Sequence, residues 1–345
     1  MALFGRRSQG SGSDRIEGFW QWWAAEGRSL AEASLARGDG TETFATTMTD
    51  RVLALGELAW ELAPGATSEH VLVLTAAGDP AGRAAARRVV LAAPESDATW
   101  SYVDARPPVG DPESVVLSLT STDVDLARVL VTARMNGSRL DVQAHHPAFA
   151  DLPVDARLQV TFLALDATLG EVDTELWLGA VQPIEFPPLD GFGLAALRSV
   201  VLDLRRQHLD EDGNPRWAVL RGETATGPLL ARVRSPLHPL TAPHLDTHVA
   251  VVLPYADVTA DGLPGEGSLQ ALNALEEHLG RELGPRGTLV AHQSSAGVRT
   301  LHLYVDSTAG LLPVVKQVAR SWDQGRAKVH DMRDPGWAAV AHLRA

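Results

Sequence analysis

The chain of 345 residues contains no cysteine. A disulfide framework, a thiol nucleophile and a cysteine metal site are therefore excluded, and this composition fits a reducing compartment. The sequence also has no run of about 18 apolar residues, the length that a membrane-spanning helix needs, and no secretory signal at its start. We expect a cytoplasmic protein that does not associate with membranes.

Familiar catalytic motifs are missing as well. The sequence has no phosphate-binding loop, no dinucleotide fingerprint, no H-E-x-x-H metal pair and no G-x-S-x-G nucleophile elbow. It therefore assigns no catalytic residue, and we expect no cofactor.

Lysine is scarce, with only Lys316 and Lys328 among 30 basic residues. The net charge of −13 argues against general nucleic-acid binding, because phosphate contacts need clustered lysine and arginine. The charge is also uneven, since residues 1–205 hold 16 basic and 28 acidic side chains, against 14 and 15 in residues 206–345. This difference, together with the polar turn DEDGNP at residues 210–215, predicts a domain boundary near residue 210.

The chain thus divides into three expected parts. Residues 1–13 are polar and rich in glycine and serine, which is typical of a flexible tail. Residues 14–209 predict an N-terminal α+β domain with a mostly antiparallel sheet, in which Asn136-Gly137 joins the strands of a hairpin. Residues 210–345 form the expected C-terminal domain.

The clearest structural signal runs from Thr288 to Asp306, TLVAHQSSAGVRTLHLYVD, where two apolar strands flank a Ser-Ser-Ala-Gly turn. The pattern predicts a strand over residues 247–253 and a helix over residues 268–283 before this hairpin. A helix over residues 310–322 and a strand over residues 326–332 are expected after it. The order βαββαβ predicts an α+β fold of the ferredoxin-like sandwich type.

Several stretches of this region form a recognisable pattern. They are THVAVVLPY (247–255), Gly262-Leu263-Pro264, the LxxLExxL pattern around Glu276, LVAHQSSAGVRTLHLYVD and Arg333-Asp334-Pro335-Gly336-Trp337. With them the region resembles the bacterial family catalogued as domain of unknown function 695. The resemblance covers about residues 210–345, and it implies no established activity, cofactor or catalytic residue. The N-terminal part looks like the uncharacterised partner region of longer proteins of this kind.

Four carboxylates precede the expected domain boundary, namely Asp166, Glu171, Asp173 and Glu175. We expect a strand over residues 171–181, which would place the last three on one face about 7 Å apart. Such a row could hold Mg²⁺ or Ca²⁺. A solvated outer strand face explains the same alternation without a metal, and we favour that interpretation.

Histidines recur on the strands of the C-terminal domain. If the alternating valine and leucine residues face the helices, each strand places one histidine on the uncovered face of the sheet, beside Thr300 and Tyr304. Histidine can bind a metal, act as a general base and titrate near neutral pH. Ordinary surface or interface histidines explain the pattern too, and we favour that interpretation, since the hairpin at residues 217–233 or the N-terminal domain could cover this face. The histidines concerned are His248, His292, His302 and His330.

The leading functional hypothesis is a non-catalytic binding or regulatory module that uses this sheet face to bind a protein partner or a small ligand. One alternative is a metal-dependent hydrolase or nuclease-like enzyme built on the histidines or on the carboxylates. A further alternative, an immunity-type protein antagonist, fits the acidic N-terminal half. The sequence leaves the oligomeric state and the partner open.

Overall fold

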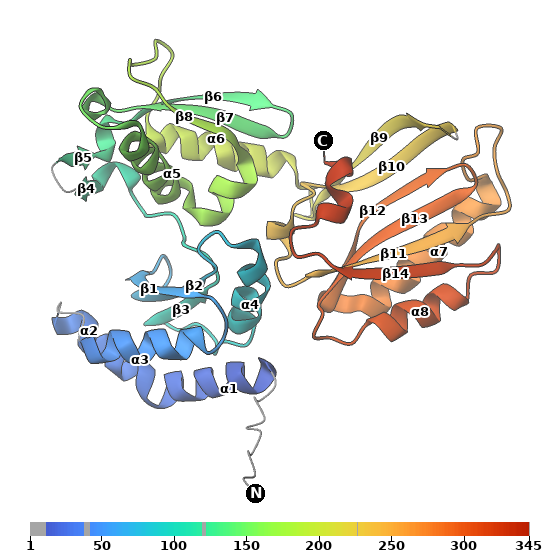
Figure 1. Cartoon of the computed structure of the whole chain (residues 1–345), viewed down its shortest axis with the longest axis horizontal. Coiled ribbons are helices and arrows are strands. Elements are labelled where there is room, and N and C mark those ends of the chain that lie inside the picture. Colours follow the sequence, from blue (N-terminus) through green and yellow to red (C-terminus); the bar gives the residue numbers. More distant parts are fainter. Residues whose placement is uncertain (1–11, 38–41, 119–121, 226, 345) are drawn as a thin grey trace, which may run out of the picture. The chain divides into compact units, whose positions relative to one another are not determined.

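A computed structural model describes residues 12–37, 42–118, 122–225 and 227–344 (Figure 1). Most of the expected tail, residues 1–11, lies outside these ranges. The chain divides into two compact units, of which one ends at Pro107 and the other begins at Pro108. The boundary expected near residue 210 falls within the second unit, and independent folding of the part that follows it stays a prediction.

The described residues form a mixed α+β structure with eight α-helices and four sheets. None of these helices is long and apolar enough to cross a bilayer.

The first unit has a three-stranded sheet with the order β1-β2-β3, in which β2 pairs antiparallel with β1 and parallel with β3. Its helices and strands pack around a core rich in aromatic side chains, including Trp20, Trp23 and Trp100. The elements are α1 (Gly12–Trp22), a π-helical turn (Trp23–Gly27), α2 (Arg28–Arg37), α3 (Glu42–Leu53), β1 (Ala59–Pro64), β2 (His70–Thr75), α4 (Pro80–Leu91) and β3 (Trp100–Val103).

The second unit begins with two small sheets, so the residues before 210 form three small sheets in all rather than one mostly antiparallel sheet. The expected hairpin is confirmed, because β6 and β7 pair from Asn136↔Arg139 onward and Gly137 has a φ of 61°. The elements are β4 (Val116–Ser118), β5 (Asp123–Asp125), β6 (Leu130–Asn136), β7 (Arg139–His145), α5 (Val154–Trp177), β8 (Leu178–Pro183) and α6 (Leu194–Gln207).

The C-terminal part is built on a six-stranded antiparallel sheet with the order β14-β11-β13-β12-β10-β9 (Figure 1). The predicted element order βαββαβ is present as β11, α7, β12, β13, α8 and β14. The hairpin β12–β13 turns at Ala296 and Gly297, whose φ values of 49° and 76° fit a two-residue turn. The elements are β9 (Arg216–Thr224), β10 (Gly227–Ser235), β11 (Thr247–Pro254), α7 (Glu266–Leu283), β12 (Gly287–Ser295), β13 (Val298–Val305), α8 (Leu312–Arg320) and β14 (Lys328–Arg333).

The two faces of this sheet are covered differently. On one face, α7 and α8 bury alternate residues such as Val251, Leu253 and Leu301 in a single apolar core. We call the opposite face the outer face. A second core lies there, in which Trp337, Val340 and Leu343 of the chain's C-terminal end pack on β10, β12 and β13. The expectation of an uncovered face is therefore wrong for this half of the sheet, because the chain's own last helical turn (Ala338–Leu343) covers it.

Candidate functional site

Two of the predicted histidines meet under this cover. His248 and His302 are 6% and 5% exposed, and His248 Nε2 lies 3.1 Å from His302 Nδ1. Their rings stack at 5.3 Å with an interplanar angle of 24°. They meet because β11 pairs antiparallel with β13, which places His248 opposite Tyr304 and Ala250 opposite His302. Sequence alternation had predicted that these three side chains share a face, and the structure brings them together.

Tyr304 ties the histidine pair to the C-terminal end of the chain. Its ring stacks on Trp337 at 4.3 Å, and its hydroxyl donates to Asp334 Oδ2 over 2.6 Å. Asp334 also accepts hydrogen bonds from the backbone N–H groups of Ala338 and Ala339 at 2.8 and 2.9 Å. The carboxylate thus caps the final helical turn. Trp337 is fully buried beside this cap.

The electrostatics of this cluster keep its members in fixed protonation states. Burial, and then the contact with Asp334, raise the pKa of Tyr304 above its ordinary value. Burial acts to raise the pKa of Asp334 too, but the hydrogen bonds from Tyr304 and from the backbone outweigh it, so this pKa lies below its ordinary value. At neutral pH a neutral phenol therefore donates to a charged carboxylate, which is a strong arrangement for holding the C-terminal turn.

His302 is the most perturbed member. Burial, followed by the neighbouring His248, His342 and His292, lowers its pKa to about 3. Within the described part of the chain, its Nε2 has no hydrogen-bond partner. His302 is therefore neutral at pH 7, and the depth of burial shields it from a substrate in bulk solvent.

The shifted pKa of His302 predicts an acid-sensitive fold. Between the ordinary value of 6.5 and the folded value of about 3, the unfolded chain binds one more proton at this residue, so stability is present above pH 6.5 and falls as pH drops. His302 contributes a slope of up to about 1.4 kcal/mol per pH unit. We expect His302→Asn to flatten urea-unfolding free energies between pH 6.5 and 5, while His330→Asn, at an exposed position, leaves the slope unchanged. An unaltered slope in His302→Asn would contradict the assignment.

His292 does not join this group, and its predicted orientation is wrong. A β-bulge between Leu289 and Ala291 shifts the register, so that Ala291 pairs with His302 and His292 pairs with Leu301. One extra residue reverses the facing of every later side chain in the strand. His292 consequently points to the α7 side of the sheet, where its Nδ1 lies 3.0 Å from Glu276 Oε1.

Glu276 lies at the centre of a second polar cluster, between α7 and the sheet. Arg299 Nη1 lies 3.0 Å from Glu276 Oε1, and Arg299 Nε donates to Ser294 Oγ over 2.9 Å. The Arg299 and Glu276 side chains are only 4% and 12% exposed. Burial acts to raise the pKa of Glu276, but His292 and Arg299 outweigh it and hold this pKa below its ordinary value. Glu276 lies in a helical pattern that the sequence shows, but no sequence signal marks Arg299 as its partner, because the alternation of β13 predicts only the side of the sheet to which a residue points.

The last predicted histidine lies on the half of the outer face that the C-terminal turn does not cover. His330 is exposed on β14 and pairs with Ala250 of β11, while Thr300 of β13 pairs with Val252. Met332, two residues along β14 from His330, is 54% exposed. Strands β11 and β14 thus leave a partly exposed strip, which we call the β11–β14 strip and define as Ala250, Val252, Thr300, Lys328, His330 and Met332.

The predicted acidic strand is wrong. Residues up to Trp177 belong to α5, with a break at Gly170, where φ is 79°. The buried residues Gly170, Thr174 and Trp177 recur at helical spacing, and the packing of that helical face overrides the apparent alternation. Glu171, Asp173 and Glu175 therefore point in different directions around a helix instead of forming a row.

Asp173 has partners of another kind. It accepts a hydrogen bond from Trp177 Nε1 at 3.2 Å and lies 3.8 Å from Arg205, and burial raises its pKa. Across the ranges that the structure describes, no group of three or more histidine or carboxylate side chains could hold a metal ion. The geometry on which a metal site at Asp166, Glu171, Asp173 and Glu175 rested is thus absent, and metal binding there stays a prediction without structural support.

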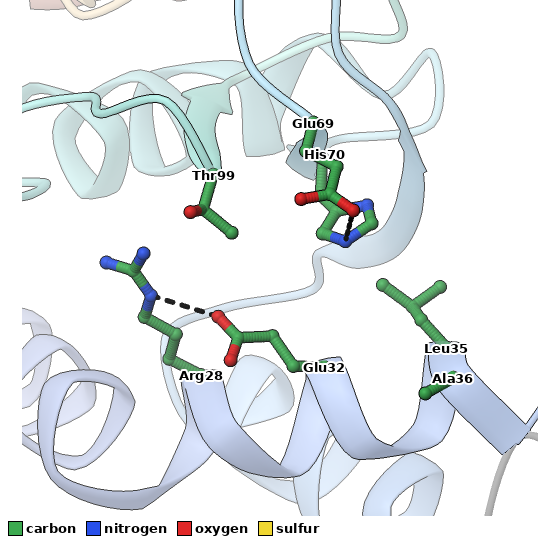
Figure 2. Close-up of a pocket in the computed structure, with 7 residues that line it drawn as sticks. All are labelled: Arg28, Glu32, Leu35, Ala36, Glu69, His70 and Thr99. Carbon is green, nitrogen blue, oxygen red and sulfur yellow. Dashed lines mark hydrogen bonds and ion pairs between the residues drawn. The ribbon is translucent and has the colours of Figure 1, made fainter.

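The first unit contains a hollow of about 600 Å³ that sequence analysis did not find. Figure 2 shows Arg28 and Glu32 of α2 on one side and Glu69 and His70 on the other. Arg28 bridges Glu32 at 3.2 Å and Asp97 at 2.7 Å, and the Trp100 indole donates to Glu32 at 2.9 Å. Chiefly that indole bond, helped by Arg28, holds the pKa of Glu32 below its ordinary value. Arg28 is thus shared by two carboxylates, and each of the three charged groups has a partner within the protein, which favours a structural role for them.

Comparison with known proteins places only the C-terminal part. No curated protein and no solved structure matches the chain. The family match leaves residues 1–215 outside it and agrees with the resemblance that the sequence showed. Residues 216–342, from β9 to the final helical turn, match the model of a family of unknown function, DUF695.

Proposed function

We propose that the C-terminal part is a non-catalytic binding module that recognises a protein partner or a small ligand through the β11–β14 strip. The observation that carries the proposal is the unequal cover of the outer face. The C-terminal turn packs over β10, β12 and β13, whereas Lys328, His330 and Met332 remain exposed. The strip also carries an exposed methionine, Met332, a residue type that is enriched at protein interfaces.

The strand order supports a ferredoxin-like assignment. Strands β14-β11-β13-β12 with α7 and α8 on one face follow the split βαβ arrangement, to which β10 and β9 are added at one edge. The fold by itself dictates no activity, so the argument depends on the strip. Burial of His248, His302 and Tyr304 favours binding over catalysis, because a general base must reach its substrate. The absence of cysteine supports action in a reducing compartment such as the cytoplasm.

Site-specific crosslinking tests the proposal. A photoreactive amino acid at Met332 in the full-length protein is expected to capture a defined partner in cells that produce it. The same amino acid at Leu269, which is 41% exposed on α7, serves as the matched control. Binding of the purified partner should weaken roughly tenfold or more in His330→Glu/Met332→Glu, because a charged, desolvated mismatch at an interface centre costs several kcal/mol. Equal capture from both positions, or unchanged affinity of the double variant, would refute the proposal.

A further inference from the structure

The β9–β10 hairpin carries a second candidate binding surface, which lies on the face of the sheet opposite to the outer face and is rich in arginine. On the side of the sheet that carries α7, Arg232 of β10 lies beside His292, with which it pairs. Arg234 follows on the same strand face and pairs with Trp217, and Arg221 of β9 pairs with Leu230. We call Trp217, Val219, Arg221, Arg232 and Arg234 the arginine face.

The three arginines have no carboxylate partner. Within the described residues, no acidic side chain lies at ion-pair distance from Arg221, Arg232 or Arg234, although Glu223 is on the same face at the end of β9. Arg232 instead lies over the Trp217 ring at 5.0 Å. Burial lowers the pKa of Arg234 below its ordinary value. An unpaired row of guanidinium groups stands out in a chain whose net charge is −13.

The spacing of these arginines matches an extended chain. Arg232 and Arg221 are diagonal neighbours on adjacent strands, and residues in this relation lie about 7 to 8 Å apart. Alternate side chains of an extended peptide repeat at about 7 Å. Guanidinium groups bind carboxylates with two parallel hydrogen bonds, which makes arginine the preferred partner for such a row.

Strand β9 also offers a backbone edge. It is the last strand of the sheet and pairs with β10 over nine consecutive residues without a bulge. Thr224 and Gly227 are the last pair of the β9–β10 ladder and must be a hydrogen-bonded pair, so Gly222, Leu220 and Ala218, at alternate positions, also bond to β10. The N–H groups of Val219, Arg221 and Glu223 therefore point to the open side. In the described part of the chain, no other backbone group meets these three. Proline within the strand or a bulge commonly protects such an edge, and β9 has neither.

We propose that β9 and the arginine face together bind an extended acidic peptide, which adds to the sheet as a further strand along residues 218–224. Backbone hydrogen bonds to the edge supply affinity, and carboxylates that reach Arg221 and Arg232 supply selectivity. The aliphatic parts of the acidic side chains can pack on Val219, which is 61% exposed, while the apolar residues between them face the other side of the sheet, where Ala218 and Leu220 lie. The free backbone edge favours a peptide over a nucleic acid, because bases and phosphates cannot continue a β-ladder.

Fluorescence anisotropy with the full chain tests the inference. The probe is a labelled eight-residue peptide of alternating glutamate and valine, and the same peptide with lysine for glutamate is its control. We expect saturable binding of the acidic peptide only. Arg221→Glu/Arg232→Glu should weaken it by roughly tenfold or more, as for other charge pairs at interfaces. Arg320→Glu/Arg326→Glu makes the same charge change at exposed positions elsewhere and should bind as the parent protein does.

Backbone methylation separates strand addition from plain charge attraction. The N–H groups of alternate residues point to opposite edges of a strand, so N-methylation of the valines and of the glutamates blocks opposite edges of the probe. One methylated peptide should bind and the other should not. The proposal would be overturned if both methylated peptides bound equally, or if the two double variants bound the acidic peptide equally. Absence of binding at millimolar peptide would overturn it as well. A twelve-nucleotide thymidine strand that binds more tightly than the peptide would overturn it in favour of nucleic acid.

Discussion

Replacing Trp337 by alanine is expected to lower the free energy of unfolding of the C-terminal part by about 3 to 5 kcal/mol, the usual cost of deleting a buried tryptophan side chain. Trp337 is 0% exposed, stacks on Tyr304 and donates from its indole to Leu245 O at 3.0 Å. Its backbone has a φ of 53°, an unfavourable value for a large residue that surrounding contacts must hold. Removal therefore leaves a cavity and frees the C-terminal turn from the sheet.

The consequence for His302 distinguishes this result from ordinary destabilisation. When the C-terminal turn no longer covers it, His302 becomes hydrated and its pKa returns toward 6.5. The change of unfolding free energy with pH should then become smaller, as should the unfolding free energy itself. Urea unfolding at pH 7.5 and 5.5 measures both effects. Trp337→Phe keeps an aromatic ring at this position but loses the indole hydrogen bond and part of the ring volume, so it should cost less than Trp337→Ala. A loss below 1 kcal/mol in Trp337→Ala would show that the C-terminal turn does not hold this face.

The fold of the C-terminal part was largely predictable because its signals are local. Alternating apolar residues mark β11 and β13, and a left-handed pair, Ala296 and Gly297, sits at the predicted hairpin turn. The facing of His248, His302 and Tyr304 followed from the same alternation. The cover over them did not, since it depends on where residues 338–343 dock after a turn at Asp334, and docking is a tertiary event.

Two errors have the same physical origin. The run Leu289-Val290-Ala291 is apolar throughout, so no polar residue marks the bulge that turns His292 to the other face. Residues 171–177 carry carboxylates at alternate positions, but Thr174 and Trp177 are buried at helical spacing, and a window this short fits both periods. When a short segment fits both the strand period and the helix period, periodicity alone cannot decide its secondary structure, and in a uniformly apolar run it cannot decide the register. Packing decided each case.

The β-bulge turns His292 toward Glu276 and so adds it to the buried ion cluster on the α7 side of the sheet. Arg299→Ala is expected to lower the free energy of unfolding by about 3 to 5 kcal/mol, because it leaves the buried Glu276 carboxylate without its main cation. Arg299 is 4% exposed and contacts both Glu276 and Ser294. Arg281→Ala, at an exposed position on the same helix as Glu276, is the matched control and should change stability by less than about 0.5 kcal/mol.

The pH dependence identifies the cause of that loss. The folded pKa of Glu276 lies below 4.5, so its stabilising contribution is present above pH 4.5 and disappears as pH falls through the folded value. Without Arg299 the pKa of Glu276 in the folded protein rises. The difference in unfolding free energy between Arg299→Ala and the parent protein should therefore be smallest in the most acidic samples that still fold. Glu276→Gln/Arg299→Met removes both charges and should recover part of the stability, since a neutral pair avoids the unpaired buried charge. A double variant as unstable as Arg299→Ala, with no dependence on pH, would show that Arg299 acts through packing and not through Glu276.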